Sequence, residues 1–395
     1  MLCNDIINVI LSFLIEVDTD VDTDVDKTPP VTLILTNDIL FLKLTSKYCH
    51  YMINKYIDNY KNARVCCKSQ IKYASVSGHV SVLDWFKVNG YKFHPNADLI
   101  HWISSKGHVN VLEWYTKTKI YILYKTSSYS HYNENISNIT TAAYNGYINV
   151  LEWWFNLYKI NEYEFIYTAE AINGASSRGH INVLEWFVKL SGCELIYDEC
   201  SVNSASKNGH IHVLEWWRDL CENSDYEFKY NSWAVRFAAM HGHINVLEWW
   251  HNSGYEFKNK EWPIHDAAVE GHANVLELFK NYGYQFYSPG NTVDDVSKHG
   301  HVNVLEWLKK YSENSDYKFQ YTERSTYTAA LNGHVHVLEW FKNSGYFLKM
   351  DPDAISVASK NGHVNVVEWF HNNGYYHEEK NNTWDELVSG GMYDY

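Results

Sequence analysis

The chain has 395 residues, of which 46% are hydrophobic and 16% aromatic, and this composition is typical of a folded protein. Its 47 acidic and 33 basic residues give a net charge of −14, which argues against binding to the phosphate backbone of a nucleic acid. The length suits two or three ordinary domains or one long repeat array.

Residues 1–60 have no copy elsewhere in the chain and contain two apolar helical patterns, over residues 2–14 and 37–57. Between them lies an acidic insert, residues 16–28, in which carboxylates alternate from Asp18 to Asp26. A calcium-binding loop counted from Asp18 would need glycine and glutamate where Thr23 and Pro29 stand. We therefore interpret the insert as a solvated, flexible acidic tract.

The two apolar segments resemble an F-box. Its first half is matched by Leu2, Ile6, Ile7, Ile10, Leu11 and Leu14, and its second half by Leu42 and Leu44. Cys3 replaces the proline of the family pattern, Asp5 replaces its glutamate, and the acidic insert interrupts its middle. The resemblance implies that these eight side chains bind the adaptor subunit of a cullin–RING ubiquitin ligase. The alternative is an ordinary two-helix cap on the region that follows.

From residue 62 onward the sequence repeats. A motif of the form "GHINVLEWW" recurs with its glycine at Gly78, Gly107, Gly146, Gly179, Gly209, Gly242, Gly271, Gly300, Gly333 and Gly362. In seven repeats a tyrosine such as Tyr255 precedes the next motif glycine by 16 residues. The length of these repeats therefore varies only before this tyrosine. There, long repeats carry four extra residues, close to one helical turn. We predict that they extend the second helix of the repeat by one turn.

Each repeat reads as a helical hairpin. In "NVLEWW" the residues Val246, Leu247, Trp249 and Trp250 fall on one helical face, so the regular tryptophan is expected in the core. The first helix, before the glycine, has alanine or serine three residues before it in all ten repeats, which lets neighbouring helices approach closely. The glycine supplies the left-handed turn between the helices. Such hairpins bury their apolar faces only by stacking.

This pattern resembles the ankyrin repeat over residues 62–391, and residues 262–272, "WPIHDAAVEGH", follow the family's "TPLHxAAxxGH" most closely. With its regular tryptophan, the motif is most similar to the repeats of ankyrin-type proteins that giant DNA viruses encode. The 16-residue segment is shorter than its counterpart in the family, which predicts short loops with little or no β-hairpin. The expected fold class is all-α, an ankyrin-like helical-hairpin solenoid of about ten repeats with shortened hairpin loops.

Two segments depart from the regular repeat. Residues 376–391 satisfy the same 16-residue spacing and are predicted to form a half-repeat that caps the stack. Residues 115–140 fit the pattern worst, and we interpret them as an extended loop or a kink in the solenoid.

The polar motif residues are interpreted as structural. Histidines in adjacent repeats are expected about 10 Å apart, too far to share a zinc ion whose ligands lie about 2 Å from it. The histidine is therefore predicted to stabilise the turn at the start of the second helix. The motif acid, such as Glu248, faces away from the apolar stripe and indicates a solvated outer face, with attraction of a basic partner as the alternative.

No P-loop, GxGxxG, GxSxG or HExxH motif is present, and the seven cysteines form no CxxC pair. No signal peptide or membrane-length apolar run is found. We expect a soluble cytoplasmic protein, in the host cytoplasm if it is viral, with no catalytic, cofactor-binding or metal-binding residues. It would bind a protein partner through variable residues of the first helices and loops, as a ligase substrate receptor if the F-box resemblance holds. The alternative is sequestration of a host factor without a ligase link, and an enzyme is a distant third.

Overall fold

The computed structural model describes residues 67–88, 90–93, 95–120, 129–160, 165–190, 194–257, 261–286 and 291–375, together with residues 15–17 and 33–35. The chain divides into two compact units, Met1–Tyr197 and Asp198–Tyr395. The described part of residues 67–375 is helical and contains no β-strand. The predicted fold class, a helical-hairpin solenoid with short connecting loops, is therefore confirmed.

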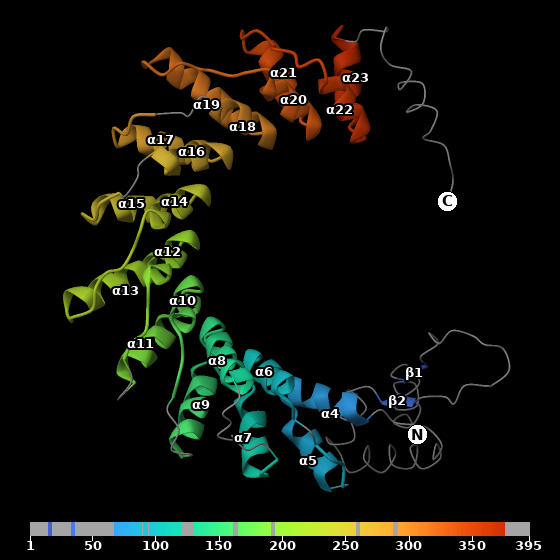
Figure 1. The fold of residues 1–395 in the computed structure, drawn as a ribbon, viewed down its shortest axis with the longest axis vertical. Coiled ribbons are helices and arrows are strands. Elements are labelled where there is room, and N and C mark those ends of the chain that lie inside the picture. The colour runs from blue at the N-terminus through green and yellow to red at the C-terminus, as the bar shows by residue number, and fades with distance from the viewer. Residues whose placement is uncertain are drawn as a thin grey trace, which may run out of the picture. The chain divides into compact units, whose positions relative to one another are not determined.

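The first unit contains four hairpins. They are α4 (Cys67–Val76) with α5 (Val80–Val88), α6 (Ala97–Ser105) with α7 (Val109–Lys117), α8 (Tyr129–Tyr144) with α9 (Ile148–Ile160), and α10 (Ala169–Ser177) with α11 (Ile181–Lys189). Within this unit each first helix packs against the first helix of the next hairpin, and the second helices pack on one another in the same order (Figure 1). The apolar faces are thus buried between hairpins as well as within them.

The N-terminal part of the first unit contains two strands that the sequence patterns did not predict. Strands β1 (Ile15–Val17) and β2 (Leu33–Leu35) pair antiparallel, with Ile15 opposite Leu35 and Val17 opposite Leu33. Each has three residues, too few to show the alternation by which a strand is recognised in sequence. Residues 2–14 and 37–57, with all eight candidate adaptor-binding residues, lie outside the described part of the chain.

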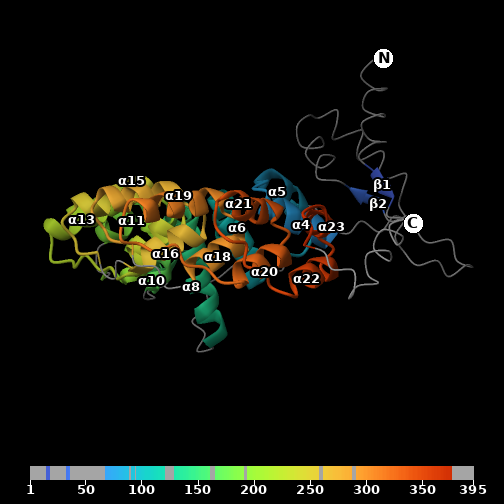
Figure 2. The ribbon, with the colours of Figure 1, turned by 90° about the horizontal axis from the view of Figure 1, so that it is seen from above.

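Helix α8 corrects the interpretation of residues 115–140 as an extended loop. The helix has 16 residues, whereas the other first helices have 7 to 10, and it includes residues 129–140. In Figure 2 it extends beyond the helices beside it. A helix whose first turns project past its neighbours needs no apolar stripe there, which explains why the polar sequence "SHYNENISN" did not read as helical.

The described residues of the second unit form six hairpins. They are α12 (Glu199–Lys207) with α13 (Ile211–Glu222), α14 (Trp233–Met240) with α15 (Ile244–Asn252), α16 (Glu261–Val269) with α17 (Ala273–Asn281), α18 (Thr292–His299) with α19 (Val302–Glu313), α20 (Arg324–Leu331) with α21 (Val335–Asn343), and α22 (Ala354–Lys360) with α23 (Val364–Asn372). The predicted cap at residues 376–391 lies outside the described residues.

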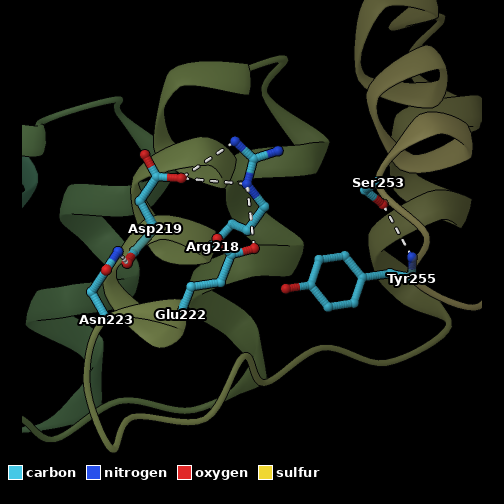
Figure 3. A network of polar contacts seen from close by, with 6 residues as sticks. All are labelled: Arg218, Asp219, Glu222, Asn223, Ser253 and Tyr255. Atoms are coloured by element: carbon cyan, nitrogen blue, oxygen red, sulfur yellow. Dashed lines mark hydrogen bonds and ion pairs between the residues drawn. The ribbon is translucent and has the colours of Figure 1, made fainter.

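The second helices differ in length as predicted. Those of the long repeats, α9, α13 and α19, have 13, 12 and 12 residues, whereas every other second helix has 9. Figure 3 shows the added turn of α13, where the Arg218 guanidinium contacts the carboxylates of Asp219 and Glu222. Asn223 donates from Nδ2 to the Asp219 carbonyl oxygen at 2.7 Å and so ends this turn.

The tyrosine and phenylalanine landmarks behind the 16-residue spacing pack across repeats. The Phe228 ring stacks on Tyr255 of the next repeat, with centroids 4.4 Å apart and planes inclined by 11°. Phe319 stacks on Tyr346 in the same way, at 4.5 Å and 12°. Ser253 also accepts a hydrogen bond on Oγ from the Tyr255 backbone N–H at 3.3 Å (Figure 3). Short loops are therefore fixed by stacked rings.

The regular tryptophan is only partly in the core, contrary to the expectation from its helical face. In six of its nine repeats it is half-buried, as Trp249 is, while the residue that follows it is buried in all nine. Trp217, Trp250 and Phe341 at this following position have no exposed surface. The tryptophan lies at the margin of the apolar face, where one edge of its indole reaches the surface.

The type of the buried residue that follows the regular tryptophan varies with the small residue that stands three positions before the motif glycine of the preceding repeat. The Trp250 indole donates from Nε1 to Ser206 Oγ at 3.0 Å, and Tyr115 Oη lies 2.8 Å from Ser75 Oγ. Ser206 and Ser75 each stand three residues before a motif glycine. Three of the repeats that have alanine in the position of this serine are followed by a repeat whose buried residue is phenylalanine. The pairs are Ala143 with Phe187, Ala239 with Phe279, and Ala330 with Phe370. In the Ser206–Trp250 and Ser75–Tyr115 pairs a buried hydroxyl thus meets the indole or phenol of the next repeat, whereas Ser104 Oγ and Trp154 Nε1 make no hydrogen bond.

We expect Ser206→Ala to destabilise the fold by about 1–2 kcal/mol, because the buried Trp250 N–H loses its acceptor. Combined with Trp250→Phe, which recreates the Ala239 and Phe279 combination, the serine substitution should cost almost nothing. Urea unfolding of the wild type, the two single variants and the double variant measures the coupling. Additive effects would contradict a specific hydrogen-bonded pairing.

Candidate interaction surface

The motif histidine joins neighbouring repeats and does not cap its own helix. It occupies the N-cap of the second helix, but its side chain makes no capping bond at His210, His243 or His272. Instead His243 Nε2 lies 2.9 Å from the Lys207 carbonyl oxygen of the preceding repeat, and His363 Nε2 lies 2.9 Å from that of Leu331. Because a carbonyl only accepts, Nε2 carries the proton. The predicted position at the start of the second helix is confirmed, and the hydrogen bond of the side chain goes to the end of the first helix of the preceding repeat.

Other motif side chains make the same kind of inter-repeat bond. Asn303, two residues after a motif histidine, donates from Nδ2 to the carbonyl of Gly271 at 2.8 Å. The indole N–H of some regular tryptophans donates to the motif acid of the preceding repeat, at 2.8 Å from Trp307 to Glu277 and at 2.6 Å from Trp369 to Glu339, whereas Trp249 makes no such bond. The recurring motif is therefore a set of contacts that hold hairpins together.

The motif acids face solvent, as predicted, but much of their charge is balanced locally. Lys117 Nζ lies 2.7 Å from the Glu113 carboxylate and Lys189 Nζ lies 2.9 Å from that of Glu185. Hydrogen bonds from Lys280 and Trp307 lower the pKa of the Glu277 carboxyl. These contacts give the motif acids partners within the fold, and they weaken the alternative that the row of acids attracts a basic partner.

The histidine row makes stability depend on pH. Burial is the largest cause that lowers the pKa of His180, His243, His301 and His334 in the folded chain. As the pH falls, the unfolded chain, with histidine pKa values near 6.5, takes up protons before the folded chain does. Stability should be complete above about pH 6.5 and should decline as the pH falls through that value.

Thermal unfolding at pH 7.5, 6.5 and 5.5 should therefore give a falling melting temperature. His301→Asn should make the decline shallower, because one of the contributing groups is removed. The exposed Asn252 on α15 supplies the control, Asn252→Ser, which changes no titratable group and should leave the slope unchanged. A melting temperature that is constant over this range would contradict the proposed linkage.

The described part of the chain holds neither a cluster of metal ligands nor a membrane-spanning helix. Within it, no group of three or more histidine, cysteine, aspartate or glutamate side chains is placed to hold a metal ion. Over the same residues, none of the helices combines the length and the apolar character needed to cross a bilayer.

The first helices carry the exposed tryptophans of the described residues. These are Trp102, Trp233 and Trp262, which are 46%, 41% and 46% exposed. Trp233 and Trp262 stand nine residues before their motif glycines, where other repeats have Asp98, Glu170, Cys200 or Asp353. They are therefore departures from the repeat. The prediction from sequence named variable first-helix residues as a class but did not single these out.

An arginine lies between two of these tryptophans. The Arg236 guanidinium is 4.4 Å from the Trp233 ring centroid and 4.9 Å from that of Trp262. It also pairs with the buried carboxylate of Asp266, from Nη2 to Oδ1 at 3.2 Å and from Nε to Oδ2. This ion pair connects α14 to α16 and fixes the two indoles on either side of the cation.

The chain resembles solved structures, among them an ankyrin repeat domain. No protein-family model matches the chain, and no curated protein matches it. The crystal structure of the human ASB11 ankyrin repeat domain aligns at 16% sequence identity and a TM-score of 0.35, over 47% of this chain and 84% of that domain. What the chain binds therefore has to be inferred from its own side chains.

Proposed function

We propose that this chain is an ankyrin-type interaction scaffold that binds a protein partner through the exposed faces of its first helices. The observation that supports the proposal is the distribution of tryptophan. On the second helices the described tryptophans are buried or half-buried, whereas Trp102, Trp233 and Trp262 on the first helices are exposed. Tryptophan, tyrosine and arginine dominate the binding energy of protein interfaces.

The cluster of Trp233, Arg236 and Trp262 suits an anchor in such an interface. Its rings are held by the cation between them and by the buried Asp266 beneath it, so little conformational entropy remains to be lost on binding. No catalytic group is needed for this function.

The test is affinity capture from a host-cell lysate with the full chain, followed by mass spectrometry. Trp233→Ala combined with Trp262→Ala should lose the captured protein while the thermal melt stays cooperative. Phe347→Ala is the matched control, because this aromatic side chain is 80% exposed but lies in a loop. Retention of every captured protein by the tryptophan variant would rule out this face as the binding site.

The finer proposal concerns residues 1–60. If Leu2, Ile6, Ile7, Ile10, Leu11, Leu14, Leu42 and Leu44 act as an F-box, the chain is a substrate receptor that presents its captured partner to a cullin–RING ubiquitin ligase. The support is the sequence resemblance alone. The virus-type motif and an odd number of cysteines without CxxC pairs favour action in a host cytoplasm.

The ligase link is tested with the full chain and a variant that carries Ile6→Asp and Ile10→Asp. The variant should lose the ligase adaptor but keep the partner of the repeat array. If the folded wild type recovers no adaptor, the ligase link fails, and the remaining function is sequestration of the partner.

A further inference from the structure

Exposed cations of the first unit differ in their surroundings, and among the described residues its second helices hold both paired cations and two without an ion pair, Lys87 and Lys159. On the second helices, Lys117 and Lys189 are paired with motif glutamates one turn away. On the first-helix side, Lys72, Lys106 and Arg178 are exposed, and the described residues place no carboxylate within ion-pair distance of them. These three cations are therefore available to an outside partner.

Two of the three cations lie against exposed aromatic rings of the adjacent first helix. Lys72 Nζ on α4 is 3.9 Å from the Trp102 ring centroid on α6, and the Arg178 guanidinium is 4.4 Å from the Tyr144 ring on α8. Trp102 and Tyr144 are 46% and 37% exposed. An aromatic ring orients a cation but leaves its net charge in place, so each pair presents a fixed positive charge beside an apolar surface.

The acids of these first helices lie at the other end. Asp98 and Glu170 are in the first turns of α6 and α10, whereas Lys106 and Arg178 cap the C-terminal ends of the same helices. Eight residues of helix separate Asp98 from Lys106, about 12 Å, which exceeds the Debye length of about 8 Å at physiological salt. The C-terminal ends are thus positive within a chain of net charge −14.

We infer that Lys72, Trp102, Lys106, Tyr144 and Arg178 form a docking surface for an acidic protein segment that has aromatic or apolar side chains between its carboxylates. The inference rests on the proposed binding function and adds the chemistry of the partner. Charge complementarity selects the carboxylates, and the two exposed rings select the apolar side chains. A protein segment is favoured over a nucleic acid, because the acidic chain as a whole repels a continuous phosphate backbone.

The experiment selects binders of the full-length chain from a yeast-displayed library of random 12-residue peptides. The strongest peptide is then synthesised with a fluorescent label and titrated by anisotropy. Two variants with the same loss of charge are compared, Lys72→Gln with Arg178→Gln on the first-helix side, and Lys117→Gln with Lys189→Gln on the second helices. The four side chains are exposed, so both variants should keep the wild-type circular dichroism spectrum.

The expected result is enrichment of aspartate and glutamate beside aromatic residues in the selected peptides. The first-helix variant should weaken binding at least about tenfold and the second-helix variant less than about twofold, and binding should weaken further as salt is raised. Selected peptides without acidic enrichment, equal losses in the two variants, or no selected peptide would each overturn the inference.

A labelled 20-nucleotide single strand of DNA gives a further outcome. If the wild type binds it and the first-helix variant does not, while acidic peptides fail to bind, the surface is for nucleic acid and the inference fails. Failure of this inference can be distinguished from failure of the proposed binding function. Partner capture that still depends on Trp233 and Trp262 keeps that function even when no acidic peptide is selected.

Discussion

Replacement of Gly271 by alanine is expected to destabilise the fold by about 2–4 kcal/mol, far more than the loss of one hydrogen atom suggests. Gly271 has a φ of +83°, and a side chain in this left-handed region costs roughly 1–2 kcal/mol. The added Cβ would also lie 2.6 Å from Nδ1 of His301 in the next repeat, so the imidazole would have to move. The motif glycine therefore serves both the turn within a hairpin and the contact between hairpins.

Gly283 provides the matched control. Its φ of +74° is nearly the same, but a Cβ at this position would meet nothing within 4 Å. Gly283→Ala should cost only the conformational part, about 1 kcal/mol. In the double variant Gly271→Ala with His301→Ala, the steric part should be relieved. Urea unfolding of the four proteins measures these differences, and equal costs at Gly271 and Gly283 would contradict the packing role of the glycine.

Removal of the Arg236 guanidinium is expected to cost about 3–5 kcal/mol, because Asp266 would be left as a buried, unpaired carboxylate. Arg236→Met keeps much of the side-chain volume between Trp233 and Trp262 and removes the charge. The expected result is a lower urea midpoint and a looser contact between α14 and α16. Faster amide exchange in these two helices would report the second effect.

The control for this prediction is an exposed ion pair. Lys117→Met removes the cation from a pair whose side chains are 74% and 47% exposed, and its cost should stay below about 1 kcal/mol. Arg236→Met combined with Asp266→Leu should regain most of the lost stability, since no buried charge remains. A small effect of Arg236→Met alone would show that water reaches Asp266, contrary to its burial.

The sequence by itself determined the repeat, its hairpin form and the position of the extra helical turn. These follow from local rules, namely the 3.6-residue period of "VLEW", the left-handed preference of glycine and the four-residue difference between long and short repeats. Each rule acts within a few residues of chain, so one sequence displays it. The long α8 was missed because its first turns carry no apolar period.

Only the tertiary structure decided what the motif side chains contact and where the binding surface lies. His243 reaches Lys207 across 36 residues, and Trp307 reaches Glu277 across 30, distances in sequence at which no local rule operates. The sequence also showed Trp102, Trp233 and Trp262 as three tryptophans among 16. Their exposure, and the cations beside them, depend on how one hairpin stacks on the next, because stacking determines which face of each first helix remains uncovered.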